Sequence, residues 1–527
     1  MRNGFRQSMA WLHSWAGLVA GWVLFAMFVT GTATYYRADI SRWMRPELPV
    51  VQQVPTPDTL AQAAETAVAH LKGAAPNAIA WYVTLPSAAD PAVGLTWFTD
   101  FARPPGTARL DPATGGPPAT RETRGGDFVY HFHYELNLPS TVGRWIAGIC
   151  AMIGLITLLS GILTHRRIFA DFFTFRRGAK SAQRSWLDAH NVVGVLAIPF
   201  HLMITYTGIA TLALMYMPWG VLAAYQGDEM RFYGETGQIT APVTPAGRPG
   251  QLAPVGPMVR QALERISEPL EMLSVDMPGD AKAKVVAVFE EPHGLSHQHP
   301  QVAFDGATGA VLEVLNPNLK PASKTFTTMV GLHEAHFAGP ALRVLFFLSG
   351  LMGAAMVGTG LVLWSVARLP KPGAAPFFGL RLVRVLNLAA IAGLPAALAA
   401  YFLANRLLPV GLGARADWEV GAFFAVWLTS AAYAGFRPQV SAWCEMLSAS
   451  AALFLAVPVV NGLTTGRHPL ASAAAGDALY LWFDAAMLGL AGLFAFAAHK
   501  ARGAEALGRR RSEVTAPPIR SNALERA

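Results

Sequence analysis

The chain has 527 residues, of which 53% are hydrophobic and only 14% are charged, whereas an average soluble protein carries about 25% charged residues. This composition excludes an ordinary soluble globular protein and predicts an integral membrane protein. The formal net charge is +8, but the basic residues cluster beside apolar runs, which indicates membrane topology rather than nucleic-acid binding.

The two cysteines, Cys150 and Cys444, lie far apart and inside apolar runs. No C-x-x-C-H motif occurs in the chain. The sequence therefore predicts neither a disulfide framework nor a cysteine-held iron–sulfur cluster, and no c-type haem. A redox metal in this protein would need histidine ligands.

Eight apolar runs are long enough to cross a membrane. In chain order they cover about residues 14–36, 145–164, 192–217, 342–364, 385–404, 419–435, 443–460 and 478–498. Arg2 and Arg6 precede the first run, basic residues are dense between residues 166 and 184, and three arginines follow the last run at residues 509–511. By the positive-inside rule, eight spans in a bacterial inner membrane with both termini in the cytoplasm satisfy each of these clusters.

Two polar segments fall on the outer side in this topology and look like copies of one α+β unit. Each has a helical stretch, at residues 59–71 and 255–266, followed by short β-prone runs. Each copy ends in a similar motif, DPATG at residues 111–115 and DGATG at residues 305–309. The motif predicts a tight hairpin turn, since aspartate bonds its own backbone and glycine supplies a positive φ.

These patterns predict a mainly α membrane protein with a four-helix transmembrane core, two outer α+β domains and four additional C-terminal transmembrane helices. The predicted parts are a first span (1–36), outer domain 1 (37–140), spans two and three with a basic inner loop (141–217), outer domain 2 (218–335), span four (336–368), four further spans (369–500) and a basic cytoplasmic tail (501–527).

The candidate functional residues are histidines that flank or enter the first four spans, because ionisable side chains at membrane depth are costly and tend to have a role. They are His13, His133, His165, His190, His201, His333 and His336. His190 and His201 are eleven residues apart, so on one straight helix both rings would leave the same face about 16 Å apart. One helix could then present ligands to two stacked haems, each completed by a histidine from another helix.

The second ligand of each haem stays open. His13 and His165 are candidates on the inner side, and His133, His333 and His336 on the outer side. The preferred ligand set is His13, His190, His201 and His333, with His133, His165 and His336 as competitors. His165 precedes two arginines, so simple charge anchoring would also explain it.

A separate group, His293, His297 and His299, has the spacing H-x-x-x-H-x-H in the second outer segment. Such a group could bind a metal. A solvated loop is the more ordinary interpretation of the same residues. No catalytic residue is assigned.

Six motifs in this order resemble the PepSY-associated transmembrane family, which contains iron-regulated inner-membrane proteins and ferrisiderophore reductases. They are LHSWAG at 12–17, HYEL at 133–136 with GRW at 143–145, GILTHRR at 161–167, DAHNVVG at 188–194, PFH at 199–201 with TG at 207–208, and LHEAHFAG at 332–339. The outer units resemble PepSY domains. The resemblance covers about residues 5–368 and leaves the last four spans without a function.

The resemblance implies a core that binds two haems b, periplasmic PepSY domains, and electron transfer across the membrane to a ferric siderophore. Such a protein would be a ferric-chelate reductase. Reduction suits iron release, because hard oxygen donors hold ferric iron more firmly than ferrous iron. The chain contains no G-x-G-x-x-G or G-x-x-x-x-G-K-[ST] motif and no flavin domain, so the expected electron donor is a quinol or a reductase protein.

Two other interpretations stay open. The protein could be a non-redox transporter or uptake accessory, with His201 relaying protons. It could also be a PepSY-based periplasmic binding or regulatory protein. Membrane lipid is an expected partner in each case, and nucleic acid in none. Haem in the purified protein would separate the redox interpretation from the other two.

Overall fold

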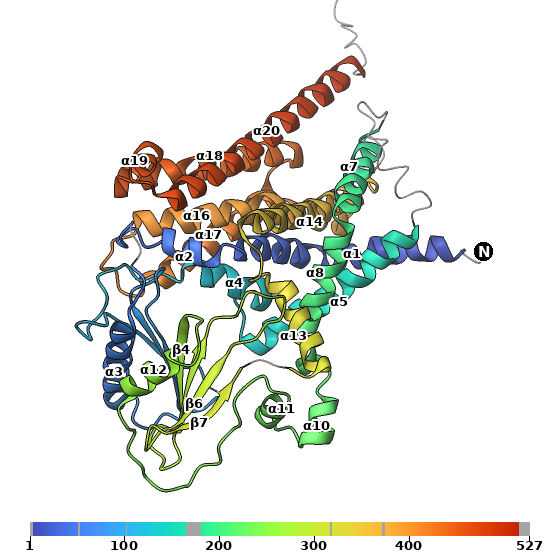
Figure 1. Ribbon diagram of the computed structural model, residues 1–527. Helices are drawn as coiled ribbons and strands as arrows, with labels where there is room; N and C mark the ends of the chain where they lie inside the picture. Colours follow the sequence, from blue (N-terminus) through green and yellow to red (C-terminus); the bar gives the residue numbers. More distant parts are fainter. Residues whose placement is uncertain are drawn as a thin grey trace, which may run out of the picture.

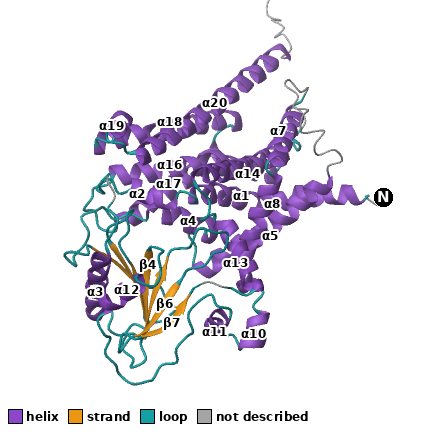
Figure 2. Ribbon diagram, in the orientation of Figure 1, coloured by secondary structure: helices purple, strands orange, loops and turns teal. Residues whose placement is uncertain are grey.

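The computed structural model describes residues 4–50, 53–101, 103–164, 181–316, 319–370 and 375–515, with side chains described up to residue 503. Long helices pack side by side, and one antiparallel sheet lies against them (Figures 1 and 2). The side of the helical bundle that carries this sheet is called the sheet side below. His165 and residues 166–180 of the predicted basic segment lie outside the described residues.

Seven helices in the described ranges are long and apolar enough to cross a membrane, and a strongly bent pair of helices makes an eighth when it is counted as one span. These spans are α1 (Phe5–Thr34), α5 (Ser140–Thr164), the pair α7 (Ala182–Leu196) and α8 (Ile198–Thr211), α14 (Pro340–Val366), α15 (Phe378–Leu388) continued through a π-helical turn into α16 (Leu394–Leu407), α17 (Arg415–Phe436), α18 (Gln439–Thr465) and α20 (Ala478–Thr515). Each coincides with one predicted apolar run. The protein is therefore a multi-pass membrane protein.

The third span is not the single straight helix expected from the sequence. It breaks at Ala197, and α7 and α8 meet at 69°. Pro199 lies in the first turn of α8, and proline both lacks a backbone N–H and clashes with the carbonyl four residues earlier. The shared helix face predicted for His190 and His201 is therefore wrong.

Both polar segments contribute to one seven-stranded sheet in the order β3-β2-β1-β4-β5-β6-β7. The first supplies α3 (Pro57–Ala74), β1 (Ala80–Thr84), β2 (Val93–Phe98) and β3 (Gly106–Leu110), and the second supplies α12 (Val255–Leu263), β4 (Leu270–Asp276), β5 (Lys284–Phe289), β6 (Gln301–Asp305) and β7 (Val311–Leu315). The helices and strands predicted in each copy are thus confirmed.

The two copies are joined at the centre of the sheet, where β1 pairs antiparallel with β4 from Ala80–Asp276 to Thr84–Met272. Helices α3 and α12 pack against each other and share one buried core with the inward residues of both copies. Alternate residues of a strand face the same side of a sheet, and Val83 and Leu273 accordingly enter this core together. The two segments therefore build one layer.

Both predicted turns form, but only the second is a hairpin, because among the described residues no strand of the sheet directly follows the first. Asp111 and Asp305 each accept backbone N–H bonds from the residues two and three positions later. Gly115 and Gly309 have φ of +69° and +74°, which only glycine adopts without strain. The second turn joins β6 to β7 as a hairpin.

The remaining helices are short. They are α2 (Arg37–Trp43), α4 (Gly125–Glu135), α9 (Ala213–Tyr216), α10 (Trp219–Tyr225), α11 (Glu229–Glu235), α13 (Pro321–Glu334) and α19 (Pro469–Ala474). Helices α4 and α13 lie between the sheet and the spans (Figure 1). Phe128 and Phe132 of α4 pack on Tyr401 and Phe423, so α4 also contacts α16 and α17 among the last four spans.

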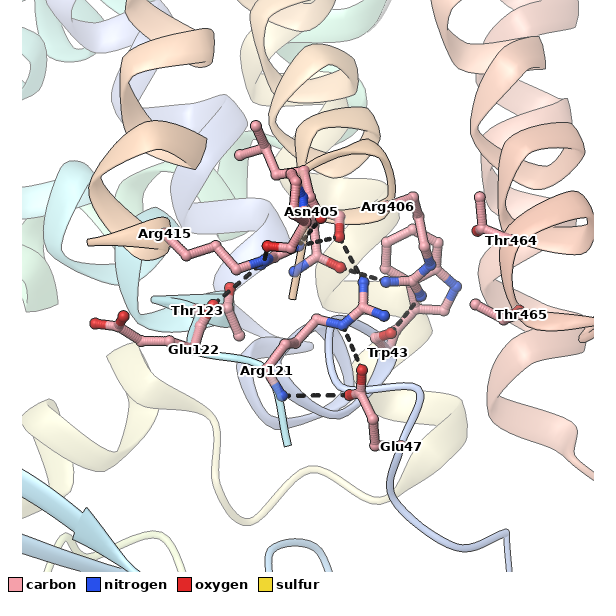
Figure 3. A network of polar contacts seen from close by, with 12 residues as sticks. Trp43, Glu47, Arg121, Glu122, Thr123, Asn405, Arg406, Arg415, Thr464 and Thr465 are labelled. Carbon is pink, nitrogen blue, oxygen red and sulfur yellow. Dashed lines mark hydrogen bonds and ion pairs between the residues drawn. The ribbon is translucent and has the colours of Figure 1, made fainter. Parts of the chain in front are cut away.

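A buried polar network fastens the last four spans to the first part of the chain (Figure 3). Arg415 and Glu419, both fully buried, form an ion pair on α17. Arg415 also donates to the carbonyl of Glu122, and the Thr123 hydroxyl donates to Glu419. Buried charges are tolerated only when they are paired and hydrogen-bonded, so this network depends on both halves of the chain.

Candidate functional site

Two histidines face each other on the sheet side of the bundle. His133 of α4 and His333 of α13 have ring centroids 6.1 Å apart and ring planes 25° apart. His133 Nδ1 lies 2.8 Å from the carbonyl oxygen of Met27 on α1, and His333 Nδ1 lies 3.0 Å from that of Ile204 on α8. Four helices thus converge on one pair of imidazoles.

A second pair has the same construction. His13 of α1 and His190 of α7 have ring centroids 6.1 Å apart and ring planes 61° apart. His13 Nδ1 lies 2.8 Å from the carbonyl oxygen of Thr157 on α5, and His190 Nδ1 lies 2.9 Å from that of Met356 on α14. Again four helices meet at two imidazoles.

Each ring also packs against a glycine. In all four cases, this glycine comes four residues after the residue whose backbone carbonyl lies beside the ring Nδ1. A Cβ on that glycine would fall 2.6 to 3.1 Å from the ring Cε1 atom, which is closer than ordinary contact. The pairs of ring and glycine are His133 with Gly31, His13 with Gly161, His333 with Gly208, and His190 with Gly360. The backbone of a neighbouring helix therefore fixes the height and the direction of all four imidazoles.

The hydrogen bonds favour one tautomer of each ring. An imidazole that donates from Nδ1 to a backbone carbonyl keeps its lone pair on Nε2, as histidines bound to metals usually do. Two imidazoles that bind one metal from opposite sides through bonds of about 2 Å place their ring centroids about 6 Å apart. Both pairs have the centroid spacing that such a shared metal ion requires.

Burial keeps the pair on the sheet side uncharged. It lowers the pKa of His133, and it lowers the pKa of His333 to about 4. Both rings are therefore neutral at physiological pH, and a neutral imidazole is the form that binds a metal.

The two pairs occupy different depths in the bundle. On α1, His13 itself belongs to one pair, whereas Met27 and Gly31 contact the other. Fourteen residues of α-helix correspond to about 21 Å along the axis. The pairs therefore lie toward opposite ends of the spans.

The other predicted histidines occupy different places. His201 is fully buried, and its ring packs against Phe28 and Phe200. No second histidine is among its ring contacts in the part of the chain that the structure describes. His165 lies outside the described residues. Which histidines bind a cofactor stays a prediction, but the geometry favours His133 over His201 as the partner of His333.

His336 belongs to a separate cluster with Glu291, His297 and Glu334. Burial opposes ionisation of Glu291, but the facing imidazoles of His297 and His336 outweigh it and lower the pKa of this carboxyl to about 2. Burial also opposes a charge on His297, whereas the carboxylates of Glu291 and Glu334 raise its pKa to about 10. Glu291 and Glu334 are not among the residues predicted from the sequence, and no motif marks Glu291.

A cavity of about 1160 Å³ connects the His133/His333 pair with the sheet. Gly31 and Gly208 line its inner part, and Thr84 and Glu271 of the sheet line its outer part. Ligand pockets usually measure about 300–1,000 Å³, so this cavity can take a large ligand. Its polar lining includes six arginines, at positions 37, 42, 45, 109, 144 and 343.

The fold and these pairs define a multi-pass membrane protein whose helices bring histidines together at two levels, one among the spans and one where α4 and α13 meet them below an α+β layer. The model of the PepSY-associated TM region matches residues 10–367, and the chain belongs to this family. No curated protein matches the chain. The family match contains both histidine pairs and the whole sheet, and the spans from α15 onward lie beyond it.

Proposed function

We propose that this protein binds two haems b and carries electrons across the bacterial inner membrane. The observation that supports the proposal is the recurrence of one arrangement, two imidazoles with centroids 6.1 Å apart, at two levels of the bundle. Haem b bound at such bis-histidine positions would supply reversible one-electron transfer. His13 with His190, and His133 with His333, would hold the two haem irons.

The surrounding residues prepare these imidazoles for that role. The carbonyls of Thr157, Met356, Met27 and Ile204 orient the rings and keep Nε2 as the metal-binding nitrogen. The glycines opposite the rings leave no side chain between ring and backbone. Packed apolar helices exclude water, which favours neutral ligands and influences the redox potential.

We further propose that the electron acceptor is a ferric siderophore bound in the cavity on the sheet side, which would face the periplasm. Arg37 and Arg109 line this cavity and pair there with Asp127 and Asp90. Their remaining guanidinium N–H groups could bind the oxygen-rich, often anionic shell of such a chelate. One electron converts Fe³⁺ to Fe²⁺, and the softer ion is held less firmly by hard oxygen donors. A quinol or a reductase protein would supply the electron on the side of His13 and His190.

The test is a visible spectrum of the purified protein in detergent, oxidised and then reduced with dithionite, together with a pyridine haemochrome count. We expect about two haems b per chain and re-oxidation of the reduced protein by a ferric siderophore without oxygen. A chain that contains no haem, although haem was supplied during expression, would overturn the proposal and favour a non-redox transport accessory.

Gly208→Ala is expected to reduce haem content from two toward one per chain. The new Cβ would lie 2.7 Å from Cε1 of His333, so the ring must move away from the position that faces His133. The measurement is the ratio of haem to protein. Gly421→Ala is the matched control, because a Cβ there meets nothing within 4 Å. An unchanged ratio in Gly208→Ala would contradict the proposed seating of His333.

A further inference from the structure

Four side chains outside the two histidine pairs aim their donor atoms at one point on the sheet side. They are Glu291, His297, Glu334 and His336, and their donor atoms all lie within 4.8 Å of one another. His297 Nδ1 is 3.1 Å from Glu334 Oε2, and His336 Nδ1 is 3.5 Å from Glu291 Oε1. Donor atoms that share one metal through bonds of about 2.1 Å lie about 3–3.5 Å apart in a tetrahedron.

The backbone holds this cluster together from two directions. Glu291 and His297 lie in the loop between β5 and β6, and Glu334 and His336 lie at the end of α13. The loop rests directly on α13, because a Cβ on Gly331 would fall 2.1 Å from the carbonyl oxygen of Leu295. The backbone N–H of His297 also donates to the carbonyl of Thr327 at 2.9 Å.

The end of α13 turns so that two of its donors reach the same point. Ala335 ends the helix in the left-handed conformation, with φ of 59°. Such a residue reverses the chain at a helix C-terminus. Glu334 and His336 on either side of it therefore both approach Glu291.

Three donor atoms of the cluster lie close together but are not joined by ordinary hydrogen bonds. Glu291 Oε1, His297 Nδ1 and Glu334 Oε2 are buried and make no hydrogen bond of ordinary geometry, although they lie within ion-pair distance. Two carboxylates brought this close repel each other unless a cation lies near both. Without a metal, the protonated imidazole of His297, which contacts both carboxylates, supplies that charge, and a metal ion would take the place of its proton. A metal ion would satisfy all three atoms at once.

We propose that Glu291, His297, Glu334 and His336 bind one divalent first-row transition-metal ion. Two imidazole nitrogens and two carboxylate oxygens suit Zn²⁺ or Fe²⁺, whereas Ca²⁺ and Mg²⁺ prefer oxygen donors alone. His299 Nε2 lies 3.4 Å from Glu291 Oε1, where it can orient that carboxylate.

The position of the site suggests the source of the ion. Glu334 follows His333 directly in the chain, and His297, Glu334 and His336 line the same cavity as the His133/His333 pair. Ferrous iron released in that cavity would meet these ligands first. This part rests on the proposed function, whereas the site itself does not.

Equilibrium dialysis of the whole purified protein in detergent against Zn²⁺ tests the site, with metal counted by mass spectrometry. We expect the wild-type chain to bind one Zn²⁺ more than Glu291→Gln and His336→Ala do, or to bind that ion at least 10-fold more tightly. His336 has a side chain that is 60% exposed, so its replacement should not disturb folding. His293→Ala, in the same loop but outside the cluster, is the control expected to bind normally.

A wild-type chain that binds no Zn²⁺, or equal affinity in all three variants, would overturn the site. A parallel dialysis against Fe²⁺ without oxygen tests whether the ion bound there can be ferrous iron released in the cavity. For that source, Fe²⁺ must bind to the same four residues as Zn²⁺. Haem content, measured on the same samples, keeps the two proposals separate. Metal binding without haem would support the metal site and overturn the proposed function. Haem without metal binding would support the proposed function and overturn the metal site.

Discussion

Alanine at His133 or at His333 is expected to remove the same haem, leaving one of two. Alanine at His13 or at His190 should remove the other. Each changed site would offer one imidazole instead of two, which should lower both haem occupancy and the low-spin absorption of the reduced protein. The measurement is the haem-to-protein ratio with the reduced spectrum, and electron transfer to a ferric chelate should be lost in all four variants.

The pairing itself is tested by double variants. His133→Ala with His333→Ala should retain one haem, because both changes affect one site, whereas His133→Ala with His13→Ala should retain none. His131→Ala is the matched control on α4, since that ring is 51% exposed and bonds Glu135 instead. Loss of a haem in His201→Ala, with the fold intact, would restore the ligand set first expected from the sequence.

Arg415→Ala is expected to destabilise the protein by about 3–5 kcal/mol, because it leaves a buried carboxylate without its partner. Glu419 is fully buried and would keep only neutral partners such as Thr123 and Asn405. The carbonyl of Glu122 would also lose its donor. The measurement is the unfolding temperature in detergent, and the last four spans should separate from α4 first.

Replacing both members of this pair, by Arg415→Met with Glu419→Leu, should recover part of the lost stability, because no charge is then left buried. The matched control is Arg437→Ala. Arg437 bonds Glu445 at the surface, and an exposed ion pair contributes little in water. An equal fall in unfolding temperature in Arg415→Ala and Arg437→Ala would show that burial does not determine how much the Arg415–Glu419 pair contributes to stability.

The spans were predictable because the thickness of a membrane fixes the length of an apolar run. The strands were predictable because alternation and turn chemistry are local properties. Two features of the fold could not be predicted from the sequence. The pairing of β1 with β4 joins segments about 190 residues apart, and no local pattern encodes it. The break at Ala197 follows from Pro199, whose effect was hidden inside a continuous apolar run.

The candidate site was predictable as a set of residues but not as pairs. Histidines near membrane depth stand out in any apolar sequence. Which of them meet depends on the rotation of each helix about its axis, and on the direction of α7 and α8 after the bend. His133 faces His333 because α4 packs across α1, a contact without a sequence signature. Glu291 becomes visible only when its loop rests on α13.

The joined sheet also constrains how the protein is made. Strand β1 emerges early in synthesis, but its partner β4 follows only after two more spans have been translated. At about 5–20 residues per second, the edge of β1 waits roughly 10–40 s for a partner. An open edge strand readily pairs with other chains. Insertion of the second and third spans must therefore be prompt, or the nascent chain needs a chaperone that covers this edge until residues 270–276 arrive.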